Sequence, residues 1–171
     1  MSQETLDHTA LAFEHLAHRP EFIETVAQWW FDHDQQQRRK TTFAQSADLD
    51  ATTRALHGCL QTDDIPQVIT ATVFGEVIGA VGLFDNDQLQ GVDLAPWVAN
   101  VYVHPDYRGH AVGSLLMKAV EAKATSMGLP TLYAKSTTRD HAAFLEKNGY
   151  TVHDISQKIG GKILIFYKEL S

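Results

Sequence analysis

A short polar stretch between two predicted elements carries residue types suited to binding an anion. Arg108 supplies a full positive charge, and Gly109 and Gly113 let the backbone approach a ligand closely. A helix is expected to begin here, and its first N–H groups are unpaired and carry a partial positive charge. The stretch therefore suits a pyrophosphate, with a glycine-containing turn that binds nothing as the alternative. It lacks the Gly-Lys-Ser/Thr ending and the glycine spacing of the common nucleotide-binding loops.

A strand and a helix are predicted on either side of this stretch. Val101 and Val103 alternate with Tyr102, as in a half-buried strand, and Pro105 ends the strand because it cannot donate to a sheet. Apolar residues then recur at helical spacing, which predicts a helix from position 112 to 127 that ends at Gly128 and Pro130. The stripe comprises Val112, Leu115, Leu116, Ala119, Val120 and Met127.

The rest of the chain alternates between predicted strands and helices. Residues 9–18 are predicted as a first strand, a helix begins at Pro20, and a second helix capped by Asp50 covers 51–60. Strands at 68–74 and 77–84 form a hairpin with Gly75 and Glu76 as its turn. Further strands are expected at 97–103, 131–134, 150–152 and 163–167, with a helix through Lys147 that Thr137 or Thr138 caps. This alternation on a mixed sheet predicts one α/β or α+β layered domain over residues 1–171.

The composition excludes several classes of protein. The formal net charge of -7 argues against general nucleic-acid binding, which needs a basic face. The single cysteine, Cys59, cannot form an internal disulfide and is expected in the core of a protein in a reducing compartment. No apolar run reaches membrane length, and the N-terminus lacks a signal core, so a cytoplasmic protein is predicted. His15 and His18 lack further ligands near them, so no metal is expected.

Two segments of the chain resemble motifs of one known family. Arg108-Gly109-His110-Ala111-Val112-Gly113 resembles the Arg/Gln-x-x-Gly-x-Gly/Ala loop of the GNAT superfamily of acetyl-CoA-dependent N-acetyltransferases. The segment from Ala142 to Tyr150 is similar to that family's later helix, which closes with glycine and an aromatic residue. The resemblance implies a GNAT-like fold with a central mixed, mostly antiparallel sheet flanked by helices. It also implies acetyl-CoA as co-substrate and a primary amine of an unidentified small molecule or peptide as acceptor.

The resemblance further implies which residues contact the coenzyme. The backbone around Val101, Tyr102 and Val103 is expected to pair with the pantetheine arm and to present an N–H group to the thioester oxygen. The following backbone is expected to hold the pyrophosphate. Predicted coenzyme contacts are Val101, Tyr102, Val103, Arg108, Gly109, His110, Ala111, Val112, Gly113, Ser114, Ser136 and Phe144. Protonated His110 is expected to strengthen this binding at lower pH, and a solvent-facing His110 is the alternative.

The chain departs from the family pattern at two positions. Ala111 stands where glycine is usual, and we expect a helical backbone there, because a left-handed alanine costs roughly 1–2 kcal/mol. Leu145 stands where many members have a tyrosine that protonates the departing thiolate. Tyr133 or Ser136 would then reach the sulfur, or water would protonate the thiolate, since a simple thiol has a pKa of only about 8.5.

The base that deprotonates the amine has no clear candidate in these motifs. The strand 97–103 contains no carboxylate, and Asp93 is the nearest acidic residue upstream. We therefore predict that Asp93 attracts the amine directly or through water, with a turn-forming aspartate as the alternative. A non-catalytic acyl-CoA-binding or regulatory module is the competing function. A homodimer is left open, and neither nucleic acid nor membrane is expected as a partner.

Overall fold

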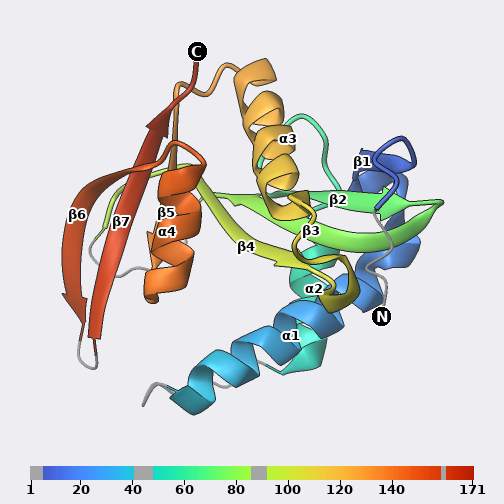
Figure 1. Cartoon of the computed structure of the whole chain (residues 1–171), viewed down its shortest axis with the longest axis horizontal. Helices are drawn as coiled ribbons and strands as arrows, with labels where there is room; N and C mark the ends of the chain where they lie inside the picture. The colour runs from blue at the N-terminus through green and yellow to red at the C-terminus, as the bar shows by residue number, and fades with distance from the viewer. Residues whose placement is uncertain (1–5, 41–47, 86–91, 159–160) are drawn as a thin grey trace.

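A single mixed sheet organises the computed structural model, which describes residues 6–40, 48–85, 92–158 and 161–171. Within these ranges seven strands follow the order β1-β2-β3-β4-β5-β7-β6 (Figure 1). Neighbouring strands are antiparallel except β4 and β5, which are parallel. The strands are β1 Leu11–His15, β2 Gln67–Val73, β3 Glu76–Phe84, β4 Trp97–Val103, β5 Thr131–Ser136, β6 Thr151–Lys158 and β7 Gly161–Glu169. The predicted mixed, mostly antiparallel sheet is confirmed.

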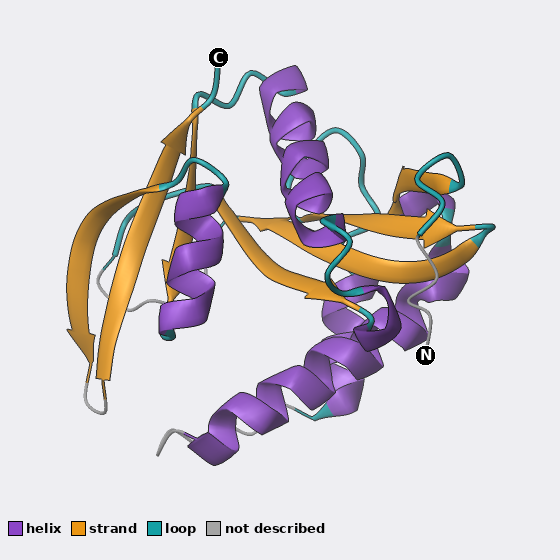
Figure 2. Cartoon of the chain, in the orientation of Figure 1, coloured by secondary structure: helices purple, strands orange, loops and turns teal. Residues whose placement is uncertain are grey.

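Helices cover both faces of the sheet (Figure 2). The α-helices are α1 Ile23–Lys40, α2 Leu49–His57, α3 Val112–Ser126 and α4 Arg139–Lys147, with short 3-10 turns η1 Leu16–His18, η2 Pro20–Phe22 and η3 Pro105–Tyr107. On one face, Val68 and Ala80 pack against the apolar sides of α1 and α2. On the other, α3 and α4 bury their apolar stripes against β2, β3, β4, β5 and β7. The amphipathic spacing of these helices predicts this layering.

Three predicted boundaries differ from the structure. Asp48, not Asp50, caps α2, because its carboxylate accepts the N–H of Ala51. The hairpin turn consists of Phe74 and Gly75, which both have positive φ, so it matches the twist of the two strands as mirror-image turns do. The first strand is shorter than predicted, because the chain turns into η1 after His15.

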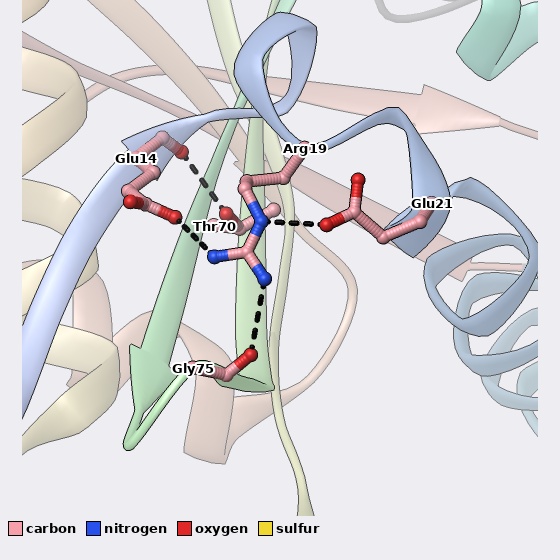
Figure 3. Close-up of polar contacts among 5 residues, drawn as sticks. All are labelled: Glu14, Arg19, Glu21, Thr70 and Gly75. Atoms are coloured by element: carbon pink, nitrogen blue, oxygen red, sulfur yellow. Dashed lines mark hydrogen bonds and ion pairs between the residues drawn. The ribbon is translucent and has the colours of Figure 1, made fainter.

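A partly buried polar network ties β1 and the turns after it to this hairpin (Figure 3). Arg19 donates to the carboxylates of Glu14 at 2.9 Å and Glu21 at 2.7 Å, and to the carbonyl oxygen of Gly75 at 3.2 Å. The hydroxyl of Thr70 donates to the carbonyl oxygen of Glu14 at 3.0 Å. These contacts hold β1 and the turn before α1 against the edge of the sheet.

The sheet opens between its two parallel strands. Among the described residues, Trp97 and Tyr133 form the register pair that joins β4 to β5, beside a hydrogen bond of 3.0 Å from the Tyr133 N–H to the Pro96 carbonyl oxygen. Beyond this pair β4 runs toward α1 while β5 runs beside α4 (Figure 1). Near the opening, Asn100 and Val101 stand opposite the single residue Val81, and Asn100 has φ 58°. Such a bulge leaves one backbone group of β4 outside the ladder.

Candidate functional site

A cleft of about 790 Å³ lies beside the second half of β4. Its walls come from α1, from β4 and the loop after it, from the first turn of α3, and from α4. The cleft is lined by Asp32, His33, Gln36, Val101, Tyr102, Val103, Pro105, Tyr107, Arg108, Gly109, Ala111, Val112, Gly113, Ser114, His141, Phe144 and Lys147. It is large enough for an extended ligand of drug size or more.

The loop at the start of α3 has a backbone shaped for an anion. Gly109 has φ 81° and Ala111 has φ 62°, both left-handed, and α3 begins at Val112 directly after them. The prediction of a helical Ala111 is therefore wrong. A left-handed residue followed by a helical one turns successive N–H groups toward a common point, which forms an anion-binding nest. The alanine adopts this conformation because the loop requires it, in spite of the strain.

Arg108 fastens this loop to β4. Its Nε donates to the carbonyl oxygen of Val103 at 2.8 Å, and its guanidinium lies 5.4 Å from the centre of the Tyr102 ring. The side chain remains exposed to solvent. A guanidinium has five donors, so this anchoring still leaves positive charge beside the nest for a phosphate group.

Tyr102 is also the point where α1 meets β4. The Trp29 indole stacks on the Tyr102 ring at 5.2 Å, and the His104 ring lies 6.1 Å from Trp29. The His33 ring meets the Tyr102 ring edge-on, with 6.2 Å between the ring centres. These ring contacts place the second half of α1 over one wall of the cleft.

Ten of the twelve predicted coenzyme residues line this cleft, on β4, the loop, the first turn of α3 and α4. His110 and Ser136 are not among the lining residues. Ser136 is buried, and its hydroxyl both donates to the Thr138 carbonyl oxygen at 2.8 Å and accepts the Thr138 N–H at 3.3 Å. It therefore organises the cap of α4, where Thr138 accepts the N–H of His141.

Neither the side chain at position 145 nor Tyr133 belongs to the cleft lining. Leu145 is buried in the core that α3 and α4 share with the sheet. Tyr133 packs against Trp97 at 5.8 Å, in a separate apolar group that includes Ile165. A protonation of the thiolate by Tyr133 or Ser136 thus has no support in this arrangement.

Asp93 lies at the end of β4 that is remote from the loop. It is exposed, precedes Trp97, and is not among the lining residues. A direct contact with the amine would require the acceptor to reach that end of the strand. The catalytic role of Asp93 stays a prediction.

Seven lining residues are not among the predicted coenzyme contacts, and five of them lie on two helices. Asp32, His33 and Gln36 come from α1, and His141 and Lys147 come from α4. The sequence does indicate a shared helix face for some of these residues. Trp29, His33 and Gln36 follow one another at spacings of four and three, and His141 and Phe144 are three residues apart. Which face of each helix meets the cleft depends on helix packing, which the spacing alone does not define.

His141 in the cleft and Cys59 in the core have pKa values shifted by their surroundings. The pKa of His141 lies below its ordinary value, first because the surrounding protein desolvates the ring and second because His33 repels its positive charge. The side chain still meets solvent through the open cleft. Burial raises the pKa of the Cys59 thiol to about 11, so Cys59 is a core residue and not a nucleophile.

The described ranges contain neither a metal-binding cluster nor a membrane-spanning helix. There, no three His, Cys, Asp or Glu side chains gather closely enough to hold a metal ion. None of the helices within those ranges combines the length and the apolar character needed to cross a membrane.

The fold and the cleft define a class: an α/β domain with a mixed sheet that opens beside β4 and a nest of backbone N–H groups at the start of α3. A family model described as "Acetyltransferase (GNAT) domain" matches residues 64–152, just over half of the chain. The chain belongs to this GNAT acetyltransferase family. The predicted family is confirmed.

Two relatives of known sequence match about half of the chain. The amino-acid acetyltransferase of Shewanella oneidensis is 37% identical over 92 residues, which are 54% of this chain and 19% of that protein. The amino-acid acetyltransferase of Salmonella typhi is 40% identical over 78 residues, 42% of this chain and 17% of that protein. The chain therefore spans about a fifth or less of the length of these relatives.

Solved structures share the fold over nearly the whole chain. An acetyltransferase of the GNAT family from Staphylococcus aureus has a TM-score of 0.68 at 15% identity, covering 95% of this chain and 100% of that one. An aminoglycoside 6'-N-acetyltransferase complexed with coenzyme A has a TM-score of 0.68 at 12% identity, and the match covers 94% of this chain and 97% of that one. These likenesses support the fold of the chain.

Proposed function

We propose that this protein transfers an acetyl group from acetyl-CoA to a primary amine, by direct attack in a ternary complex. The observation that carries the proposal is the cleft itself: the wedge beside β4 leads directly into the nest formed by Gly109, Ala111 and the start of α3. Membership of the GNAT acetyltransferase family supports it. So does the coenzyme A complex of the related fold.

The residues of the cleft fit the coenzyme. A Cβ on Gly113 would lie 3.3 Å from the Phe144 ring, whereas the glycine leaves room between α3 and α4. The backbone N–H groups of Val112, Gly113 and Ser114 begin α3 and are suited to the pyrophosphate, with Arg108 adding charge. The backbone of Val101, Tyr102 and Val103 would pair with the pantetheine arm along the open edge of β4.

Catalysis would come largely from positioning. Holding thioester and amine in reacting geometry can supply on the order of 7–11 kcal/mol of the barrier. The bulge at Asn100 and Val101 frees a backbone group of β4 to face the thioester oxygen, and one such donor is typically worth about 3 kcal/mol. Coenzyme A would leave as the thiolate, which water can protonate, since a thiol has a pKa of about 8.5.

The acceptor class follows from the relatives. Both relatives described above are named amino-acid acetyltransferases, so the α-amino group of an amino acid or amino-acid derivative is our first choice. A cytoplasmic location, one domain over residues 1–171 and a possible homodimer belong to the same proposal as predictions.

The test is a thiol-release assay with acetyl-CoA against free amino acids, polyamines, aminoglycosides and peptides, followed by mass spectrometry of the product. We expect stoichiometric thiol release and a mass increase of one acetyl group on an amino acid. Coenzyme binding without transfer to any amine would favour the non-catalytic acyl-CoA-binding module instead. The absence of both binding and transfer would contradict either function.

A further inference from the structure

Two histidines from different helices line the same cleft. His33 lies on α1 and His141 at the start of α4. The His33 ring meets Tyr102 of β4 edge-on at 6.2 Å and 74°, and the His141 ring stacks on Phe144 at 6.1 Å and 21°. Each imidazole is thus positioned by an aromatic wall on its own side of the cleft, beside the strand along which the thioester would lie.

The other ionisable groups of the cleft surround this pair. Asp32 accompanies His33 on α1, Tyr102 belongs to β4, Tyr107 and Arg108 lie in the loop region, and Lys147 lies on α4. Asp32 is the carboxylate among the described lining residues, and β4 contains none. The two imidazoles are therefore the lining groups whose ordinary pKa lies closest to neutral pH.

The protein around His141 favours the neutral form of its imidazole. A positive charge on His33 opposes a positive charge on His141, and the surrounding protein removes part of the solvation of that charge. A neutral imidazole has one nitrogen that can accept a proton. An amine acceptor in its ammonium form must lose a proton before its nitrogen can attack.

We propose that His141 is the general base that deprotonates the acceptor ammonium, and that His33, which lines the same cleft, is a positioning residue for it. This proposal rests on the acetyltransferase function proposed above. The N–H bond of the ammonium breaks, and its proton passes to the free ring nitrogen of His141. The nitrogen lone pair then forms the bond to the acetyl carbon, and the carbon–sulfur bond breaks.

The remaining protons balance without another reactant. After the attack the new amide nitrogen holds one surplus proton, and the departing thiolate needs one. That proton passes to the sulfur directly or through water, and His141 returns the proton it took to solvent. The net products are the acetylated amine, coenzyme A as thiol, and one free proton.

The test measures kcat/KM from pH 5.5 to 9 for the wild type, His141→Gln and His33→Gln, with the best acceptor of the thiol-release panel. His8→Gln, an exposed histidine outside the cleft lining, is the matched control. For His141→Gln we expect kcat/KM to fall about 100-fold at neutral pH, with its acidic limb lost, because a positioned base contributes at least that factor. His8→Gln should reproduce the wild-type profile.

The variant His33→Gln tests whether the acidic limb of kcat/KM reports the protonation of His141. Removing the repulsion raises the pKa of His141, so the acidic limb of kcat/KM should move to higher pH while the rate above pH 8.5 stays near that of the wild type. A limb that stays in place would overturn the role of His33. Thermal unfolding and a coenzyme A shift, run on each variant, should match the wild type and so exclude a folding defect.

The outcomes distinguish this proposal from the function on which it rests. If the wild type releases thiol and His141→Gln keeps both its rate and its acidic limb, the base assignment is wrong and the acetyltransferase function stands. If the wild type transfers acetyl to no amine, the proposed function fails, and the base assignment fails with it.

Discussion

Ala111 carries the backbone strain of the anion-binding loop. Its φ of 62° lies in the left-handed region, which a Cβ atom disfavours and glycine does not. The same conformation helps to turn the N–H groups toward the cleft, so the strain and the binding geometry have one origin.

Replacing Ala111 by glycine should relieve that strain. We expect Ala111→Gly to raise the free energy of unfolding by about 0.5–1 kcal/mol, the relief in the folded loop minus the greater freedom of glycine in the unfolded chain. Urea unfolding measures this change. Ala111→Val, with a branched Cβ, serves as the opposite control and should lower stability. An unfolding midpoint for Ala111→Gly below that of the wild type would contradict the assigned conformation.

His15 is a buried histidine that stability requires in its neutral form. Its Nδ1 accepts the N–H of Ala17, and its Nε2 lies 3.1 Å from Oε1 of Gln67, so the proton is assigned to Nε2. Burial is the main cause that lowers the pKa of His15, and the positive charges of Lys123 and His18 add to it. Protonation would convert Nδ1 from an acceptor to a donor and break the contact with Ala17.

The direction of this shift defines the pH dependence of folding. Because the pKa of His15 is lower in the folded than in the unfolded chain, its contribution to stability is complete above about pH 6.5, the unfolded value, and is lost as pH falls through the folded value. Urea unfolding between pH 4.5 and 8 should show this loss. The free energy of unfolding should depend less steeply on pH in His15→Gln than in the wild type. An unchanged slope in that variant would assign the acid sensitivity to other groups.

At the scale of the elements, β3 and β4 approach each other more closely at Gly79 than a side chain allows. A Cβ at Gly79 would lie 2.8 Å from the carbonyl oxygen of Tyr102 and 3.0 Å from Leu116 of α3. Glycine at this position lets β3 lie close to both β4, which lines the cleft, and α3.

Alanine at this position should displace β4. We expect Gly79→Ala to lower the free energy of unfolding by about 2 kcal/mol, as overpacking of a well-packed core does. Gly82→Ala on the same strand is the matched comparison, because the three atoms nearest to its Cβ all belong to the Phe84 ring, a side chain that can rotate away, and none to the backbone. Chemical unfolding of both variants gives the measurement. An equal or larger loss in Gly82→Ala would contradict the argument from backbone contact.

At the scale of the whole molecule, α3 holds together the two parts of the sheet that diverge at the cleft. Its apolar side packs on β2, β3 and β4, and it shares one hydrophobic core with Leu132 of β5 and Phe166 of β7. Lys168 of β7 donates to Glu121 of α3 and to the carbonyl oxygen of Asn148, both at 2.9 Å. A ligand in the cleft would add contacts across the same division.

Coenzyme A should therefore stabilise the folded protein. At a free concentration 100 times its Kd, a ligand that binds only the folded state adds about 2.7 kcal/mol, which for a chain of this size corresponds to a rise in Tm of about 5–10 °C. Differential scanning fluorimetry with acetyl-CoA and CoA measures the shift. Arg108→Ala should reduce it, and the absence of any shift in the wild type would contradict the coenzyme site.

The sequence by itself determined most of the elements and the glycine-containing loop before α3, for which it predicts anion binding. Apolar spacing defines the stripe of α3, and Arg108, Gly109 and Gly113 mark the helix start, because both signals depend on residues close together in the chain. The family resemblance added the sheet type and ten of the residues that line the cleft. The predicted backbone at Ala111 was wrong, because the closing geometry of the loop, and not alanine's own preference, decides that angle.

Only the tertiary structure decided which distant side chains share the cleft. The spacing of His33 and of His141 indicates amphipathic helices, but it does not say that α1 and α4 meet across one strand, because this depends on how each helix packs on its face of the sheet. The same packing left Ser136 and Leu145 in the interior and Asp93 outside. Local periodicity is encoded within a few residues, whereas the meeting of remote groups follows from the global fit of the core.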